Sequence, residues 1–174
     1  MILFSKKKLK VYSIIILTGV FLAILCKLFI FEFLTISGQS MTPNIKDNQK
    51  IIINKIAYGI QKPLKGEFLF QWSSPKKNDV VIFLHNNKIV VKRCILIQGE
   101  SLEFLYDEQY NYYYIQTGER KIEITREQKK RFENCTKVPE GYVFVVGDND
   151  KYSIDSRDYG FVSVKNITGR VIGK

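Results

Sequence analysis

The feature that most constrains this chain of 174 residues is an apolar run near its N-terminus. The run extends from Val11 to Phe31, contains a charge only at Lys27, and follows four lysines among the first ten residues. A bilayer core of about 30 Å needs roughly 20 apolar residues to be crossed as a helix. We therefore predict a single transmembrane anchor over residues 11–32, with the Lys27 amine extending to the interface. The lysines predict that residues 1–10 are a cytoplasmic basic tail and that residues 33–174 lie on the outer face of the cell membrane.

A cleavable signal peptide is the alternative interpretation of this run. The stretch is long for the apolar part of such a peptide, and no pair of small residues suited to cleavage follows it. A lipoprotein box ending at Cys26 is also disfavoured, because Leu25 is too large for the position before the cysteine. The segment is therefore expected to be retained.

Composition limits the classes of molecule that this chain is expected to bind. A net charge of +10 favours an anionic surface, and the apolar run favours lipid over nucleic acid, for which no helix-turn-helix or aromatic-basic motif is present. Cys94 and Cys135 are expected to be two thiols, because no spacing argument brings them together. With His85 as the only histidine, neither a metal cluster nor a histidine-based site is expected, and no cofactor is implied.

Short strands and turns follow the anchor, which predicts an all-β domain over residues 33–174. Residues 79–84 and 88–93 flank His85-Asn86-Asn87 as a hairpin, and residues 100–140 form a variable insertion with one short helix near 125–132. Pro63, Gly66 and Pro75 break the chain between strands. The apolar stretch 68–72 is assigned to the core, with a surface that enters the membrane as the alternative. Further strands are expected at residues 49–55, 141–147 and 167–172.

A candidate nucleophile lies just after the apolar run, in Ser37-Gly38-Gln39-Ser40-Met41-Thr42-Pro43. A serine hydroxyl needs a base, and His85 is predicted at a polar, exposed hairpin tip. Lys92 follows an apolar strand, and burial there would lower its pKa toward neutrality. Strand alternation would send Lys92 and Arg93 to opposite faces, one into the core and the other to water. The competing interpretation of Lys92 is an ordinary solvated charge.

Polar residues gather again after the strand at 141–147. The segment Gly147-Asp148-Asn149-Asp150 is typical of a turn. Beyond it, Ser153 is placed to orient a base by a hydrogen bond. Asp155 and Arg157 are expected to form an ion pair that supports the loop.

Four segments, in this order along the chain, resemble bacterial type I signal peptidases, the membrane-bound serine-lysine leader peptidases. They cover most of residues 33–172 and match poorly over 100–140. The matching segments are Ser40-Met41-Thr42-Pro43, residues 55–60, Asp79–Phe83 with Val91-Lys92-Arg93, and Gly147-Asp148-Asn149 with Ser153, Asp155, Ser156, Arg157 and Gly160.

The resemblance implies a signal-peptidase-like β fold and cleavage of signal peptides from exported preproteins at small-x-small sites, by a monomer. It makes Ser40 the nucleophile and Lys92 the general base, with the Ser40 N–H as one oxyanion donor. Some family members add a serine hydroxyl where this chain has Gly38, so the second donor stays open. Met41 would shield Lys92, Ser153 would hold the lysine, and Asp155 with Arg157 would support the loop.

The sequence departs from the family pattern at Leu96 and at residues 98–100 after the lysine, and at Asp150 and Tyr152 after the Gly-Asp-Asn turn. These departures affect the expected groove and leave open a dedicated peptidase for one substrate class, such as a conjugative pilin precursor. A catalytically silent, membrane-tethered binding module is the alternative outside enzymes. Self-cleaving serine-lysine repressors share the dyad but are soluble and bind DNA.

Overall fold

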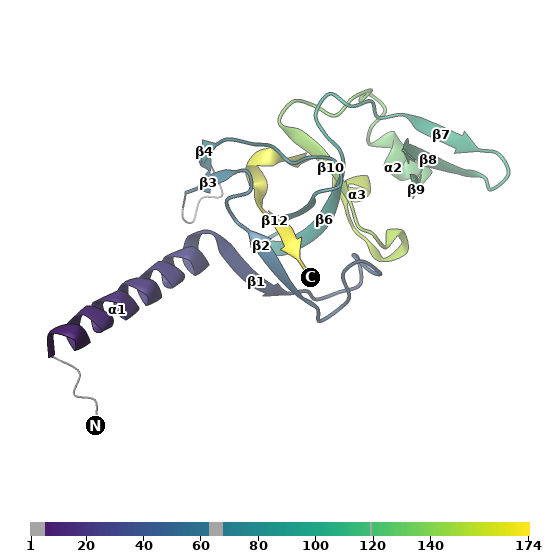
Figure 1. Ribbon diagram of the computed structural model, residues 1–174. Coiled ribbons are helices and arrows are strands. Elements are labelled where there is room, and N and C mark those ends of the chain that lie inside the picture. Colours follow the sequence, from purple (N-terminus) through teal and green to yellow (C-terminus); the bar gives the residue numbers. More distant parts are fainter. Residues whose placement is uncertain (1–5, 63–67, 119) are drawn as a thin grey trace.

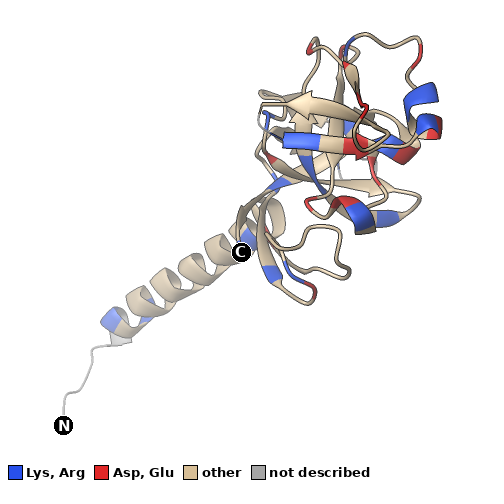
Figure 2. Cartoon of the chain, turned by 90° about the vertical axis from the view of Figure 1, so that its right-hand side faces the viewer, with Lys and Arg blue, Asp and Glu red and all other residues tan. Residues whose placement is uncertain are grey.

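The computed structural model describes residues 6–62, 68–118 and 120–174. Its first element is the helix α1 (Lys6–Phe29), which extends away from the remainder of the chain (Figure 1). The 22 residues Lys8–Phe29 have a mean hydropathy of 2.3, and none of them is buried. The hydroxyls of Ser13 and Thr18 donate to the Leu9 and Ile14 carbonyls of the preceding turn, so they need no water. Figure 2 shows the helix free of charge between its basic ends.

A seven-stranded sheet forms the centre of the domain, in the order β1-β2-β12-β5-β6-β10-β11. All its pairs are antiparallel, and β1 begins two residues after α1 ends. The mostly β domain behind a long apolar helix confirms the predicted fold class. The strands are β1 (Phe31–Thr35), β2 (Lys50–Asn54), β5 (Val80–His85), β6 (Lys88–Leu96), β10 (Tyr142–Val146), β11 (Val162–Ser163) and β12 (Ile167–Gly173).

The hairpin between β5 and β6 follows directly from its turn residues. Asn86 and Asn87 both have positive φ, 49° and 60°, which asparagine tolerates and the tight hairpin turn requires. His85 pairs with Lys88 at this turn. His85 is half-buried against the ring of Tyr159, with centroids 4.1 Å apart, so its predicted exposure was wrong.

Two smaller sheets complete the domain. Strands β3 (Gly59–Gln61) and β4 (Phe68–Gln71) form one, and residues 63–67 between them lie outside the described residues, as do the predicted breaks at Pro63 and Gly66. The second sheet lies within the predicted insertion and projects from the main sheet on the side away from α1 (Figure 1). It consists of β7 (Phe104–Asp107), β8 (Tyr112–Thr117) and β9 (Arg120–Ile124).

Four short helical elements follow β9. The helix α2 (Arg126–Lys130) is where the sequence predicts one, and it begins with a capping box in which Thr125 and Gln128 each accept from the other's backbone N–H. The turn η1 (Asp150–Tyr152) and the helix α3 (Ser156–Tyr159) come after β10. A further turn, η2 (Val164–Asn166), leads into β12.

The apolar stretch 68–72 is largely on the surface, which corrects its assignment to the core. Phe70 is 67% exposed and Trp72 is 55% exposed, and Leu69 is exposed as well. Phe68 alone packs against a buried cluster that includes Tyr58 and Phe83. A short apolar strand has the same pattern whether its far side meets protein or lipid, so the sequence could not separate the two cases.

Candidate active site

The central contact of the site joins Ser40 to Lys92. Ser40 lies in the loop after β1, Lys92 lies within β6, and Lys92 Nζ donates a hydrogen bond to Ser40 Oγ at 2.8 Å. The lysine is only 4% exposed. Its burial lowers its pKa, an effect that Asp155 and Asp148 oppose and the Arg157 charge supports. In the neutral amine the roles reverse, and the serine hydroxyl donates to the nitrogen lone pair.

The loop that carries Ser40 is held by apolar packing beneath it and by a hydrogen bond within it. Met41, 1% exposed, packs with Ile45 in a buried cluster beneath the loop. Gly38 has a φ of 109°, a value that favours glycine, and its N–H donates to Asp47 Oδ1 at 2.7 Å. The Gly38 N–H is therefore already used in a hydrogen bond within the loop.

Asn149 ties the same loop to the turn after β10. Its backbone N–H donates to the Ser40 carbonyl at 2.9 Å. Its side-chain amide donates to the Gln39 carbonyl at 3.1 Å and to Thr42 Oγ1 at 2.8 Å. Three bonds from one residue thus hold the segment 39–42 that carries the Ser40 hydroxyl.

Asp155 is fully buried at the centre of the loop that follows β10, which is called the supporting loop below. Both carboxylate oxygens bond the Arg157 guanidinium at 2.9 Å, which is the ion pair predicted from the sequence. The same carboxylate accepts from the Gly147 N–H at 3.1 Å and from Ser153 Oγ at 2.6 Å. The Ser153 proton is thereby directed to Asp155, so a bond between Ser153 and Lys92 would use the serine oxygen as the acceptor.

Gly147 fills the space between the two serines. A Cβ placed on it would lie 2.5 Å from the Ser40 carbonyl oxygen and would overlap Ser153 Oγ. Real carbon atoms do not approach so closely, so only glycine lets the turn pass behind the Ser40 loop. Because only glycine fits at position 147, Ser153 and the Ser40 loop can both pack against this residue.

Two arginines, Arg93 and Arg120, contact the turn after β10, and these contacts were not predicted from the sequence. Arg93 does not remain in water, since its side chain is 21% exposed and forms two bonds of 2.7 and 2.6 Å with Asp148. Arg120, from the predicted insertion, donates to the Gly147 carbonyl at 3.0 Å and to Asp150 Oδ1 at 2.8 Å. No local pattern marks either contact, because the partners lie 27 to 55 residues apart along the chain.

An apolar groove of about 660 Å³ lies where α1 meets the domain. Leu28 and Phe29 from α1 line it together with Leu34 of β1 and Ile60 of β3. Other lining residues, Ile53 and Ile82, belong to the buried cluster that also holds Met41. The wall of the groove is thus continuous with the packing beneath the Ser40 loop.

The remaining sulfur and acidic groups do not form a further centre in the described part of the chain. Cys94 is buried, which raises its pKa to about 12 and leaves it a protonated thiol. Cys135 is half-buried and Cys26 lies on α1, and all three cysteines are free. Residues 6–62, 68–118 and 120–174 contain no group of three or more His, Cys, Asp or Glu side chains suited to a metal ion.

Comparison with known proteins identifies the family. The model of the signal peptidase family, peptidase S26, matches residues 9–173. Signal peptidase I of Bacillus caldolyticus is 32% identical over 83% of this chain and 79% of its own length, and that of Aquifex aeolicus is 29% identical over 86% and 79%. Signal peptidase I V of Bacillus subtilis is 28% identical over 87% of this chain and 89% of its own. A crystal structure of a signal peptidase I from Enterococcus faecalis covers 57% of this chain and 98% of its own, at 26% identity and a TM-score of 0.41.

A family match over almost the whole length, with a relative above 30% identity, settles the assignment. The N-terminal apolar helix is consistent with a single-pass membrane anchor. The chain therefore belongs to the signal peptidase family, peptidase S26, and is a serine peptidase of the signal peptidase I type that cleaves the signal peptides of preproteins.

Proposed function

We propose that Ser40 is the nucleophile and Lys92 the general base of this peptidase. The supporting observation is the contact of 2.8 Å between Lys92 Nζ and Ser40 Oγ, made by a lysine that is almost fully withdrawn from water. Neutral Lys92 takes the hydroxyl proton as Ser40 Oγ attacks the scissile carbonyl. The resulting ammonium then gives the proton to the leaving amine, which leaves an acyl-enzyme at Ser40.

The second half of the cycle uses the same two groups. Neutral Lys92 accepts a proton from a water molecule that attacks the ester, and it returns that proton to Ser40 Oγ as the new carboxyl group departs. The Ser40 backbone N–H is one donor to the oxyanion. Asp155 is supported by Arg157 and holds Ser153 and Gly147, so these four residues keep the wall behind the dyad in place.

The substrate is proposed to bind as an extended strand against the sheet, with its apolar upstream segment in the groove beside α1. The groove supports this because its lining is apolar and reaches the packing beneath the Ser40 loop. Small side chains before the scissile bond are expected, as the family's small-x-small sites require. One chain supplies every residue named here, in keeping with a monomer.

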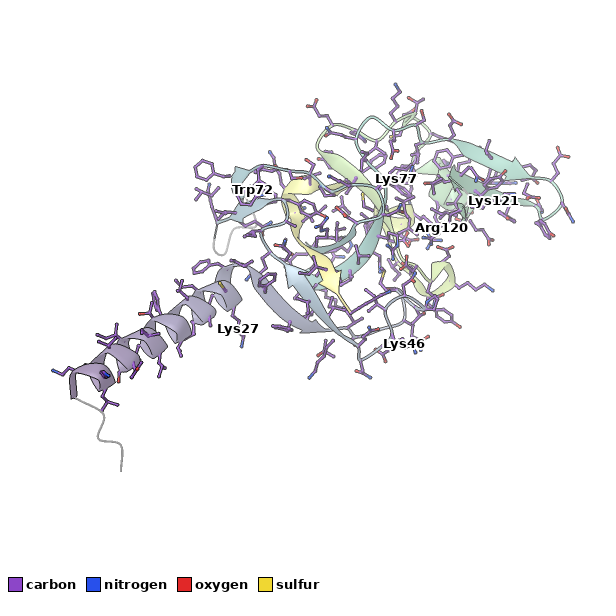
Figure 3. The ribbon with its side chains drawn as sticks, viewed as in Figure 1. Lys27, Lys46, Trp72, Lys77, Arg120 and Lys121 are labelled. Carbon is purple, nitrogen blue, oxygen red and sulfur yellow. The ribbon has the colours of Figure 1, made fainter. Side chains whose placement is uncertain are left out.

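The proposed orientation has the basic N-terminus in the cytoplasm and the domain on the outer face of the membrane. Residues 1–5 of the basic tail lie outside the described residues, while Lys8 and Lys10 lie at the start of α1. Membrane lipid is also the proposed partner of the exposed residues Leu69, Phe70 and Trp72. Ile60 lies in β3, which pairs with β4, and it lines the groove together with the last turn of α1. This pair of strands, with Trp72 directly after it, therefore lies beside α1. Figure 3 shows Trp72 on the side of the domain from which α1 extends.

The dyad is tested with the full chain in detergent or liposomes and a precursor that has a small-x-small site. Ser40→Ala should lower kcat by up to about 10⁶-fold, the scale seen when a serine peptidase loses its nucleophile. Lys92→Met should lower it at least about 10²–10⁴-fold. Ser37→Ala and Lys88→Met remove the same groups from exposed positions on the same loop and strand, and both should cleave normally. Near-normal cleavage by Ser40→Ala or Lys92→Met would refute the assignment.

A further inference from the structure

One side chain of the insertion over residues 100–140 reaches the turn after β10 directly. Arg120 is the first residue of β9, and its Nη2 donates to the Gly147 carbonyl at 3.0 Å and to Asp150 Oδ1 at 2.8 Å. Its Nη1 lies 3.7 Å from Asp148 Oδ1. Figure 3 shows Arg120 where the three-stranded sheet meets the rest of the domain. One guanidinium thus contacts three of the four residues of the turn after β10.

The same turn contacts Ser40 directly and contacts the strand of Lys92 through Arg93. Gly147 abuts the Ser40 carbonyl, and the next-but-one residue, Asn149, bonds the same carbonyl. Asp148 binds Arg93, which is adjacent to Lys92 in β6. Displacement of the turn would therefore move Ser40 relative to Lys92.

A second bond from β9 reaches the same region. Arg157 Nη1 donates to the Glu123 carbonyl at 3.1 Å, so the strand is joined both to the turn and to the arginine that pairs with Asp155. The insertion is thereby coupled to this region at two positions of β9. Gln128 of α2 adds a third contact, because its side-chain amide donates to Asp158 Oδ1 at 2.7 Å. All three contacts come from the predicted insertion.

An arginine suits this position for a geometric reason. A planar guanidinium offers several N–H donors in a fixed fork and can serve a carbonyl and two carboxylates at once, whereas a lysine amine acts as a point charge. The Arg120 side chain is 31% exposed, and ion pairs at such positions contribute little to the free energy of unfolding. Its contribution should therefore appear in the geometry of the site rather than in the melting temperature.

We propose that Arg120 is a positioning residue for cleavage, through which the insertion fixes the turn 147–150 and with it the distance between Ser40 and Lys92. This inference rests on the proposed roles of Ser40 and Lys92. It predicts an effect on kcat and not on KM, because the groove proposed for the substrate is lined by none of residues 100–150.

The test compares Arg120→Met with Lys121→Met in the full-length protein. Lys121 is the adjacent residue of β9, and its charge contacts Asp107 and the Tyr114 ring within the insertion. Arg120→Met should lower kcat about 10–100-fold, the scale of a misplacement of about 1 Å at a catalytic group. KM and the melting temperature should stay near the wild-type values, Arg120→Lys should recover part of kcat, and Lys121→Met should match the wild type.

Three results would overturn the role of Arg120. They are an unchanged kcat in Arg120→Met, an equal loss in Lys121→Met, and a loss of kcat accompanied by a large fall in melting temperature. Ser40→Ala, assayed in parallel, separates this inference from the one it depends on. Inactive Ser40→Ala with fully active Arg120→Met would reject Arg120 alone, whereas active Ser40→Ala would reject the dyad.

Discussion

Lys92 Nζ lies 2.8 Å from Ser40 Oγ on a side chain that is almost completely buried, in a strand whose neighbouring residue Arg93 reaches Asp148. The pairing bears on the chemical difficulty of the lysine base that we propose. An ordinary lysine has a pKa of about 10.4 and is almost entirely protonated at neutral pH. Burial beside Ser40 lowers the pKa of Lys92 and so favours the neutral amine. The same burial lowers the stability of the fold, because a charged lysine would prefer water.

The first prediction concerns the pH dependence of cleavage. Only neutral Lys92 can accept the Ser40 proton, so kcat should fall as pH falls through the lysine pKa. Because burial lowers that pKa, the fall should be centred below the pKa of about 10.4 of free lysine. Single-turnover cleavage measured from acid to alkaline pH checks this. A rate that keeps rising to about pH 10.4 would show an ordinary lysine and contradict the proposed environment.

The second prediction is that Lys92→Met folds at least as stably as the wild type near pH 7. A lysine whose pKa is lowered by folding binds fewer protons in the folded than in the unfolded state, so stability is lost as pH falls from about 10.4 toward the folded pKa. Methionine has a similar length and no such cost. Melting temperatures of both proteins should therefore differ most at low pH and converge toward about pH 10.4. A lower melting temperature for Lys92→Met at pH 7 would oppose this account.

A third prediction separates the buried ion pair from exposed ones. Asp155→Asn would leave the Arg157 guanidinium, 5% exposed, without its counter-charge. Breaking a buried pair in this way costs about 3–5 kcal/mol of unfolding free energy. Lys77→Met, which breaks an exposed pair with Glu100, should change it by about 0–1 kcal/mol. Urea unfolding measures both, and equal small losses would show that the Asp155 pair is not a support.

The fourth prediction uses the only tryptophan in the chain, Trp72. If the exposed hairpin contacts lipid, Trp72 emission in liposomes should be shifted to the blue and quenched by brominated acyl chains. Phe70→Ser should weaken both effects while α1 still anchors the protein. The same change at Tyr110, an exposed aromatic residue of the insertion, serves as the control. Emission typical of water, without quenching, would exclude contact between this surface and the membrane.

Much of the fold could be predicted because its signals are local. An apolar run of sufficient length predicted α1, and the asparagines at the tip predicted the hairpin of β5 and β6. The exposure of residues 68–72 could not be predicted, since apolar residues that face lipid and apolar residues that face protein have the same pattern. The motifs placed Ser40 and Lys92 in the expected segments, but their separation depends on the packing of β1, β6 and the turn after β10.

The contacts of Arg120 could not be predicted from a local sequence pattern. Its partners, Gly147 and Asp150, are 27 and 30 residues away along the chain. Hydrogen bonds of this kind are determined by how two sheets meet in space. Sequence reasoning therefore recovers the reacting groups more readily than the residues that hold them in place.

The last prediction is that Gly147→Ala loses activity through sterics alone. The added Cβ would lie 2.5 Å from the Ser40 carbonyl oxygen and would overlap Ser153 Oγ, so either the turn or the nucleophile loop must move. Overpacking of this sort costs about 1–3 kcal/mol of stability, and a shift of about 1 Å at Ser40 lowers kcat on the order of 10²-fold. The same substitution at Gly19, where a Cβ meets no atom within 4 Å, should leave kcat unchanged. Wild-type cleavage by Gly147→Ala would mean that the turn can retreat without moving Ser40, and the tight packing between turn and loop would then have no part in setting the distance from Ser40 to Lys92.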